Sequence, residues 1–131
     1  MKKLFISCPM RGRTEENIKN SMERMHKIAE LMFGEELDPI QSYFENETPP
    51  ENVNERIWYL GKSLELLAEA DYFIGPDYFS DIFKGCDVER KVAREYTIPM
   101  VTINAYTLMP DLRGVEATVR CANEERIATC L

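Results

Sequence analysis

Residues 71–103, DYFIGPDYFSDIFKGCDVERKVAREYTIPMVTI, decide the fold that the sequence predicts. The apolar run Asp71–Gly75 predicts a buried strand, Gly85–Tyr96 predicts a helix, and Pro99–Ile103 predicts the next strand. A strand, a helix and a second strand in this order form a right-handed βαβ unit with parallel strands. The segment therefore predicts a parallel sheet covered by helices.

The chain before this segment continues the alternation. Lys3–Ser7 predicts a first strand and Glu36–Ile40 a second one. One helix is expected between a cap at Thr14 and an end near Gly34, and another starts at Asn54. Their apolar positions share one face of each helix: Ile18, Met22, Met25, Ala29 and Met32, then Ile57, Leu60, Gly61, Leu64, Leu67 and Ala68. The pattern predicts an α/β three-layer sandwich of the flavodoxin or Rossmann-like type, with a mostly parallel sheet of four or five strands.

Length and composition indicate one soluble domain over residues 1–131. A chain of 131 residues can bury a single core, and 44% hydrophobic with 30% charged residues is ordinary for a globular protein. No apolar run approaches the ~20 residues that a membrane span needs. The basic, then apolar stretch Met1–Met10 is too short for a signal peptide, so we expect a cytoplasmic protein. Val115–Ala128 is expected to form a final helix.

Charge and metal-ligating residues exclude several functions. A net charge of −7 argues against a surface dedicated to nucleic acid. The four cysteines lack metal-ligand spacing and His26 is the only histidine, so we expect no metal, no cofactor and mostly structural thiols. His26 is expected at the surface of the first helix without a catalytic role. The cysteines are Cys8, Cys86, Cys121 and Cys130.

Glu89 is the leading candidate for chemistry because it interrupts an apolar helical face. The residues at i+3, i+4 and i+7 from it are Val92, Ala93 and Tyr96, so they share its face. Near the helix start, the helix dipole stabilises an anion by about 0.3–1 kcal/mol. Arg90, Lys91, Arg94 and Glu95 are expected on the opposite, solvated face. The alternative is a capping box, in which Glu89 folds back on the backbone near Cys86 or Asp87.

The expected topology brings three loops to Glu89. In open parallel sheets, ligands bind at the carboxyl ends of the strands, beside the switch in strand order. Ser7–Gly12 and Gly75–Lys84 follow the carboxyl ends of predicted strands, and the second of these leads into the Glu89 helix. These segments are therefore expected to converge on Glu89.

Three motifs occur in an order that resembles the nucleoside 2-deoxyribosyltransferase superfamily. Ala70-Asp-Tyr-Phe-Ile-Gly75, Gly85-Cys-Asp-Val-Glu89 and Ile98-Pro99 match its Ala-Asp strand, its Gly-x-x-x-Glu helix start and the beginning of its next strand. The opening Phe5-Ile-Ser-Cys-Pro-Met-Arg-Gly12 is similar to its first strand and loop. The resemblance covers about residues 3–103. It looks closest to the 2′-deoxynucleoside 5′-phosphate N-hydrolases and to a small uncharacterised bacterial and phage branch.

The resemblance implies cleavage or exchange of an N-glycosidic bond. In that superfamily the glutamate attacks the anomeric carbon of a 2-deoxyribosyl substrate and displaces the base, and water or another base resolves the covalent ester. It implies that Glu89 is the nucleophile and Asp71 has a supporting catalytic role, with a substrate phosphate or sugar near Arg11. The substrate-binding residues would be Ser7, Met10, Arg11, Gly12, Gly75, Ser80 and Gly85.

The expected partners are a small nucleoside or nucleotide and a second copy of the chain. Members of the superfamily commonly complete the site across a dimer, and the broad apolar stripes at 18–32 and 57–68 offer surface for contacts. We therefore expect a homodimer or a dimer of dimers, and neither nucleic acid nor membrane as a partner.

Two other functions stay open. Phe5 stands where members of the superfamily often have a tyrosine, and Cys8-Pro9 replaces a Gly-Pro or Gly-Ser pair. These differences favour a non-catalytic protein that binds a nucleotide-like metabolite. In the third alternative the chain is a flavodoxin-like partner module, and Glu89 only caps its helix.

Overall fold

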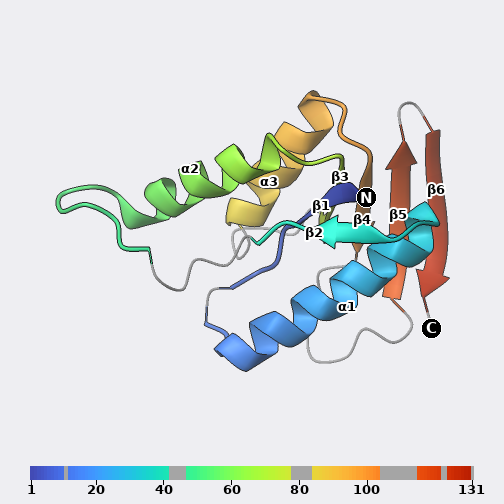
Figure 1. Cartoon of the computed structure of the whole chain (residues 1–131), viewed down its shortest axis with the longest axis horizontal. Coiled ribbons are helices and arrows are strands. Elements are labelled where there is room, and N and C mark those ends of the chain that lie inside the picture. Colours follow the sequence, from blue (N-terminus) through green and yellow to red (C-terminus); the bar gives the residue numbers. More distant parts are fainter. Residues whose placement is uncertain (11, 42–46, 78–83, 104–114, 122–123, 131) are drawn as a thin grey trace.

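One six-stranded sheet, in the order β2-β1-β3-β4-β5-β6, organises the computed structural model (Figure 1). The structure describes residues 1–10, 12–41, 47–77, 84–103, 115–121 and 124–130, the last two segments as backbone only. The elements in chain order are β1 (Lys2–Ile6), α1 (Glu15–Phe33), β2 (Leu37–Pro39), α2 (Glu55–Leu67), β3 (Tyr72–Pro76), α3 (Lys84–Glu95), β4 (Met100–Ile103), β5 (Val115–Cys121) and β6 (Glu124–Cys130).

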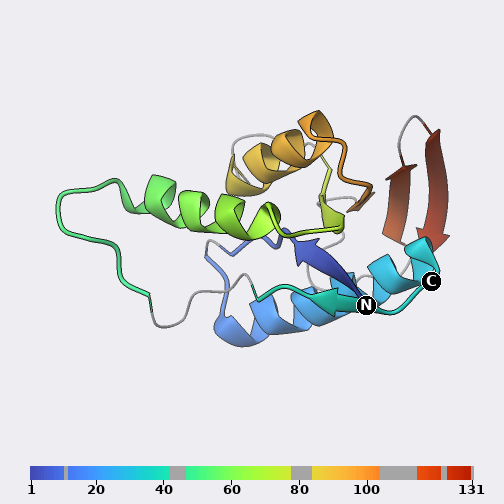
Figure 2. The same cartoon turned by 45° about the horizontal axis from the view of Figure 1, so that its top comes forward.

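The first four strands are parallel and form a flavodoxin-like sandwich, which confirms the predicted fold class. Helix α1 contacts β1, β2 and β3, whereas α2 packs against α3 and α3 against β3. Figures 1 and 2 show α2 and α3 together on the face of the sheet opposite α1. This arrangement follows from right-handed crossovers that lead from β1 to one side of the sheet and from β3 to the other.

The C-terminal segment departs from the prediction. Strands β5 and β6 form an antiparallel hairpin that adds to β4, so the expected helix over Val115–Ala128 is wrong and the sheet has six strands rather than four or five. Apolar and polar residues alternate from Val115 to Cys121, which is the period of a strand. Pairing also satisfies the open hydrogen-bonding edge of β4.

The alternating side chains of the strands build one core on each face of the sheet. Leu4 and Ile6 face α1, whereas Phe5 faces α2 and α3 and stacks on Phe73 with ring centroids 5.9 Å apart. The core under α1 contains Leu4, Ile6, Cys8, Ile18, Met25, Ile28, Ala29, Leu37, Ile74, Val101 and Ile103. The core on the other face contains Phe5, Leu67, Phe73, Ala93 and Met100.

The predicted helix caps are confirmed. The Thr14 side chain accepts a hydrogen bond from Asn17 N at 3.1 Å, and the side chain of Asn54 accepts one from Ile57 N at 3.1 Å. Gly34 ends α1 with a φ of 75°, a left-handed conformation that favours glycine. These contacts join residues three or four positions apart, which explains why the sequence revealed them.

The two apolar helices are buried to different degrees. Ile18, Met25 and Ala29 of α1 are buried against the sheet. In α2 only Leu67 is buried, and Ile57 is 66% exposed. Figure 2 shows α3 lying beside the second half of α2 only. The apolar stripe of α1 is therefore used within the chain, whereas part of the α2 stripe remains open. Within the described residues, no helix combines the length and the hydropathy of a membrane span.

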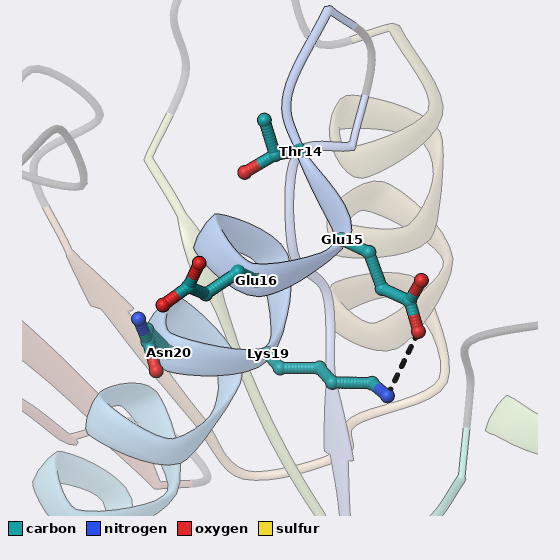
Figure 3. A pocket seen from close by; sticks show the side chains of 5 residues that line it. All are labelled: Thr14, Glu15, Glu16, Lys19 and Asn20. Carbon is teal, nitrogen blue, oxygen red and sulfur yellow. Dashed lines mark ion pairs between the residues drawn. The ribbon is translucent and has the colours of Figure 1, made fainter.

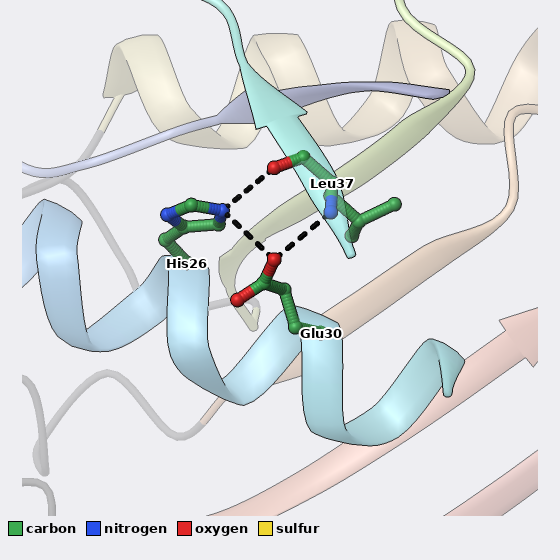
Figure 4. A network of polar contacts seen from close by, with 3 residues as sticks. All are labelled: His26, Glu30 and Leu37. Carbon is green, nitrogen blue, oxygen red and sulfur yellow. Dashed lines mark hydrogen bonds and ion pairs between the residues drawn. The ribbon is translucent and has the colours of Figure 1, made fainter. Parts of the chain in front are cut away.

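His26, whose side chain is 26% exposed, connects α1 to the edge strand β2 (Figure 4). Its Nε2 lies 2.9 Å from the carbonyl oxygen of Leu37 and 3.4 Å from Glu30 Oε2. Glu30 Oε2 also accepts a hydrogen bond from Leu37 N at 2.9 Å. Because both neighbours of Nε2 are acceptors, Nε2 carries a hydrogen. His26 and Glu30, which lie one helical turn apart, thus bind the carbonyl oxygen and the N–H of Leu37.

Candidate functional site

Glu89 lies on the buried face of α3, with its side chain directed into the molecule. The residue is 8% exposed, and the other buried residues of α3 are Cys86, Arg90 and Ala93. Tyr96 is 74% exposed, so the predicted face is shifted by about one residue. Arg90 was expected in solvent but is 4% exposed, because its guanidinium pairs with the carboxylate of Asp87 one turn earlier. An ion pair of this kind lets a charged side chain be buried.

A serine hydroxyl from another element holds the Glu89 carboxyl. Ser7, directly after β1, donates from Oγ to Glu89 Oε1 at 3.0 Å, and this contact is buried. The hydroxyl of Ser63, on α2, contributes to lowering the pKa of Glu89. Ser7 lies outside α3, whereas a capping box would direct the carboxylate to the backbone of its own helix. The site therefore joins the end of β1 to α3.

Burial changes the acidity of Glu89. Removal from water disfavours the charged form and raises the pKa of Glu89 to about 7, while the hydroxyls of Ser7 and Ser63 act in the opposite direction. A carboxyl group with this pKa exists in both its protonated and its ionised form near neutral pH. Groups of this kind are typical of catalytic sites.

Gly75 leaves room for Ser7. A Cβ atom at Gly75 would lie 2.9 Å from two ring atoms of Phe73 and 3.0 Å from the Cβ of Ser7. Such distances are too short for any side chain, so a glycine is required here. Ser7 N also donates to the carbonyl oxygen of Ile74 at 2.8 Å, and Ser7 is 1% exposed. Gly75 and Ser7 thus meet as predicted, at the carboxyl ends of β3 and β1.

This meeting point is the switch in strand order. From β1 the chain passes through α1 to β2 on one side, and from β3 it passes through α3 to β4 on the other side. At such a point the two connections diverge, and open α/β sheets bind their ligands in the resulting crevice. The position of Glu89, Ser7 and Gly75 is therefore the one that this fold favours for a ligand.

The loop between β1 and α1 is held by Arg13. Its Nη1 donates to the carbonyl oxygen of Pro9 at 2.8 Å and its Nη2 to that of Asn17 at 3.3 Å, with a further bond to the Ser21 hydroxyl. Arg13 N donates to the carbonyl oxygen of Met10 at 3.2 Å. This cation therefore shapes the loop through contacts within the chain.

Besides Ser7, two of the expected substrate-binding residues in this loop are described. Met10 packs against the core under α1, and Gly12 is exposed with a φ of 73°, which requires glycine in the turn. Arg11 and Ser80 lie outside the described residues. Gly85 is exposed in the first turn of α3, and a Cβ there would meet nothing within 4 Å. Sterically, Gly85 is therefore not required to be glycine.

Asp71 lies at the start of β3, the end of the sheet opposite to Ser7 and Gly75, so the structure does not bring it together with Glu89. Its Oδ2 accepts a hydrogen bond from Lys3 N at 2.8 Å, and Asp71 N donates to the carbonyl oxygen of Lys3 at 2.9 Å. Gly75 follows four residues later, roughly 13 Å along the strand at the usual rise per residue. Asp71 therefore ties the start of β3 to the start of β1.

Two buried thiols surround the site. Burial raises the pKa of Cys8 to about 11 and also raises the pKa of Cys86, with the charge of Glu89 adding to both effects. Both cysteines are free and remain neutral thiols at physiological pH. Neither thiol is therefore a nucleophile, and both are uncharged groups near Glu89.

A hollow at the start of α1 is separate from Glu89 (Figure 3). The residues that line the hollow are all exposed: Thr14, Glu15, Glu16, Lys19 and Asn20. Within it, Lys19 Nζ forms an ion pair with Glu15 Oε1 at 2.9 Å. Among the described residues no group of three or more His, Cys, Asp or Glu side chains could hold a metal ion. Neither observation gives an alternative to Glu89 as the candidate site.

Ser63, whose hydroxyl contributes to lowering the pKa of Glu89, is a residue that the sequence analysis did not connect with Glu89. It lies 26 positions before Glu89, in a different helix, so no local spacing connects the two. The available signal was a serine inside a helix, where the hydroxyl disfavours the helix unless it has a partner.

No family model, no characterised protein and no solved structure matches this chain. What the protein does must therefore be inferred from its fold and from the surroundings of Glu89.

Proposed function

We propose that this protein cleaves or exchanges the N-glycosidic bond of a 2′-deoxynucleoside or its 5′-phosphate, with Glu89 as the nucleophile. The observation that supports the proposal is a buried carboxyl, held by the hydroxyl of Ser7 at the switch point of an α/β sheet. The order of motifs in residues 3–103 supplies the substrate class. Asp71 has no part in the proposed chemistry, because its contacts are with Lys3.

The chemistry requires two displacements at one carbon. An oxygen of ionised Glu89 attacks the anomeric carbon, the carbon–nitrogen bond breaks, and its electron pair leaves with the base, which takes a proton from solvent. Water then attacks the same carbon and loses a proton, and the ester bond returns its electron pair to Glu89. In the exchange reaction the nitrogen of a second base replaces water. A nearby carboxylate suits both steps because the transition states resemble an oxocarbenium ion.

The acidity of Glu89 sets the expected pH dependence of this reaction. Only the ionised form can attack, and burial raises the pKa of Glu89 to about 7. Base release should therefore rise about tenfold per pH unit below that pKa and level off above it. The Glu89→Gln variant should show no base release at any pH.

Chromatography of free base tests the proposal directly. The protein is incubated with the common 2′-deoxynucleosides and their 5′-phosphates, with and without a second base to accept the sugar. A 2-fluoroarabinosyl analogue, whose fluorine slows ester breakdown, should leave the sugar attached to the peptide that contains Glu89. The matched control is Glu95→Gln, because Glu95 is an exposed glutamate of the same helix. Failure to release base from every substrate would defeat the proposal.

A second candidate is a non-catalytic protein that binds a nucleotide-like metabolite at the same site. It is favoured by Phe5, which is fully buried and stacked on Phe73 and so brings no hydroxyl to the carboxyl end of β1. Under this alternative, a nucleotide raises the melting temperature of the protein without losing its base. If nucleotides neither release their base nor raise the melting temperature of the protein, the third alternative, a partner module, remains.

We also propose that two copies associate through α2 rather than α1. Most apolar residues of α1 pack against its own sheet, with Leu31 as a 71% exposed exception, whereas α2 buries only Leu67 and leaves Ile57 66% exposed. An apolar helix face that its own chain leaves uncovered is a candidate contact surface. The free thiols of Cys8 and Cys86 fit a reducing, cytoplasmic setting.

A further inference from the structure

We infer that Ser7 is a positioning residue, which holds one oxygen of the Glu89 carboxyl through both steps of the reaction, rather than a substrate-binding residue. The inference rests on the proposed function, which makes Glu89 the nucleophile. It deepens that function, because it gives the two oxygens of one carboxyl different tasks.

The sheet fixes Ser7 at the carboxyl end of β1. Ser7 N donates to the carbonyl oxygen of Ile74 at 2.8 Å, which continues the parallel pairing of β1 with β3. Gly75 leaves space beside it, because a Cβ atom there would lie 3.0 Å from the Cβ of Ser7. Ser7 is 1% exposed, so chain atoms rather than solvent surround it. Its position is therefore set by the fold and does not depend on a ligand.

The Ser7 hydroxyl is engaged by Glu89. Its Oγ donates to Glu89 Oε1 at 3.0 Å in a buried contact. A serine hydroxyl carries one proton, so this bond uses the only hydrogen that Ser7 could offer to a substrate. Because the contact is buried, Oε1 is directed into the molecule, and the other oxygen of the carboxyl is the one that attacks the anomeric carbon.

The bond from Ser7 is useful in both steps. In the sugar ester, Oε2 is bonded to the anomeric carbon and Oε1 is the carbonyl oxygen, which still accepts from the hydroxyl. When water attacks that carbon and loses a proton, the bond from the carbon to Oε2 breaks and its electron pair returns to the carboxylate. The hydrogen bond to Oε1 strengthens as this charge develops, because bonds to ionised acceptors are the stronger ones. Loss of the hydroxyl should therefore slow the breakdown of the ester.

The charges around Glu89 leave this task to a neutral donor. Among the described residues, the titratable groups whose charges couple to Glu89 are the thiols of Cys8, which follows β1, and of Cys86 on α3. Arg90, the buried cation of α3, pairs with Asp87.

The test compares Ser7→Ala, which removes the donor and leaves a small space, with Ser7→Cys, whose thiol fills that space but is a weak donor. The readout is the titration of Glu89, followed by the carboxyl carbon signal in protein labelled with carbon-13 at glutamate Cδ. Loss of a hydrogen bond to the ionised form should raise the pKa of Glu89 by roughly 0.5 to 1 in both variants. The control is Ser21→Ala, which removes another buried serine hydroxyl, one that bonds to Arg13, and it should leave the Glu89 titration in place.

Ser7→Ala also gives a kinetic readout. From a pKa of about 7, a rise of roughly 0.5 reduces the ionised fraction of Glu89 at pH 6 about threefold, so base release at pH 6 should fall at least threefold. A positioning role predicts a lower kcat with little change in KM, whereas a substrate-binding role predicts a higher KM and an unchanged titration. The 2-fluoroarabinosyl ester on Glu89, followed by the mass of the intact protein, should persist longer in Ser7→Ala than in the wild type.

The outcomes separate this inference from the proposed function. An unchanged Glu89 titration in folded Ser7→Ala overturns the positioning role, and so does a higher KM with an unchanged kcat. If Ser7→Ala does not fold, Ser7→Cys carries the same test. If wild-type protein releases no base, the proposed function fails, while the titration still shows whether Ser7 holds Glu89. A raised pKa in both Ser7 variants, with Ser21→Ala unchanged, supports the inference.

Discussion

Replacement of Glu89 by glutamine should change how the stability of the protein depends on pH. Burial raises the pKa of Glu89 from 4.5 to about 7, so the folded protein binds this proton more tightly than the unfolded chain does. The contribution to stability is therefore fully present below pH 4.5 and is lost as the pH rises through 7. At 1.36 kcal/mol per pKa unit, the loss amounts to about 3 kcal/mol by pH 8. A glutamine side chain cannot ionise, so the Glu89→Gln variant should not show this loss of stability.

Urea unfolding of both proteins at pH 4.5, 6, 7 and 8 measures the effect. The free energy of unfolding of Glu89→Gln, minus that of the wild type, should increase by about 3 kcal/mol over this range. The series stops at pH 8 because the thiols of unfolded Cys8 and Cys86 ionise near pH 9. The exposed Glu95 of the same helix gives the control, and Glu95→Gln should keep the wild-type slope. Parallel curves for wild type and Glu89→Gln would refute the assignment of a buried carboxyl with a raised pKa.

The remaining predictions concern activity, packing and assembly. Glu89→Gln should lower base release by orders of magnitude yet keep nucleotide-induced thermal stabilisation; retained activity would rule out Glu89 as the nucleophile. Asp71→Ala should cost about 0.5–1.5 kcal/mol of stability, through the lost bond to Lys3, and leave base release per folded molecule unchanged. Gly75→Ala should destabilise the fold by about 1–3 kcal/mol and shift Ser7 away from Glu89, as carbon-13 titration of Glu89 would reveal. Ile57→Glu should convert a dimer into a monomer in light scattering without lowering the melting temperature of the monomer; a wild-type monomer at all concentrations would exclude the α2 interface.

The sequence by itself determined the features that depend on neighbouring residues. The caps at Thr14 and Asn54 and the left-handed end at Gly34 join residues within one helical turn, so their residue types identify them. The alternation of apolar runs with amphipathic segments predicted the parallel strands β1 to β4, because the crossover rule leaves few other topologies. The position of Glu89 on a largely apolar helical face likewise predicted its burial.

Only the tertiary structure decided which distant groups meet. The alternation over Val115–Cys121 fits a strand, but the pairing of the β5–β6 hairpin with the open edge of β4 is a tertiary contact that the alternation does not specify. Arg90 is buried because Asp87 neutralises it, so the buried face of α3 differs from the one that hydropathy predicts. The positions of Asp71 and Ser7 were decided in the same way. Asp71 lies a strand's length away from the carboxyl end of β3, whereas the packing of α3 on the sheet brings Glu89 to Ser7, which is 82 residues away in the chain. Burial of apolar surface rather than chain proximity selects such contacts.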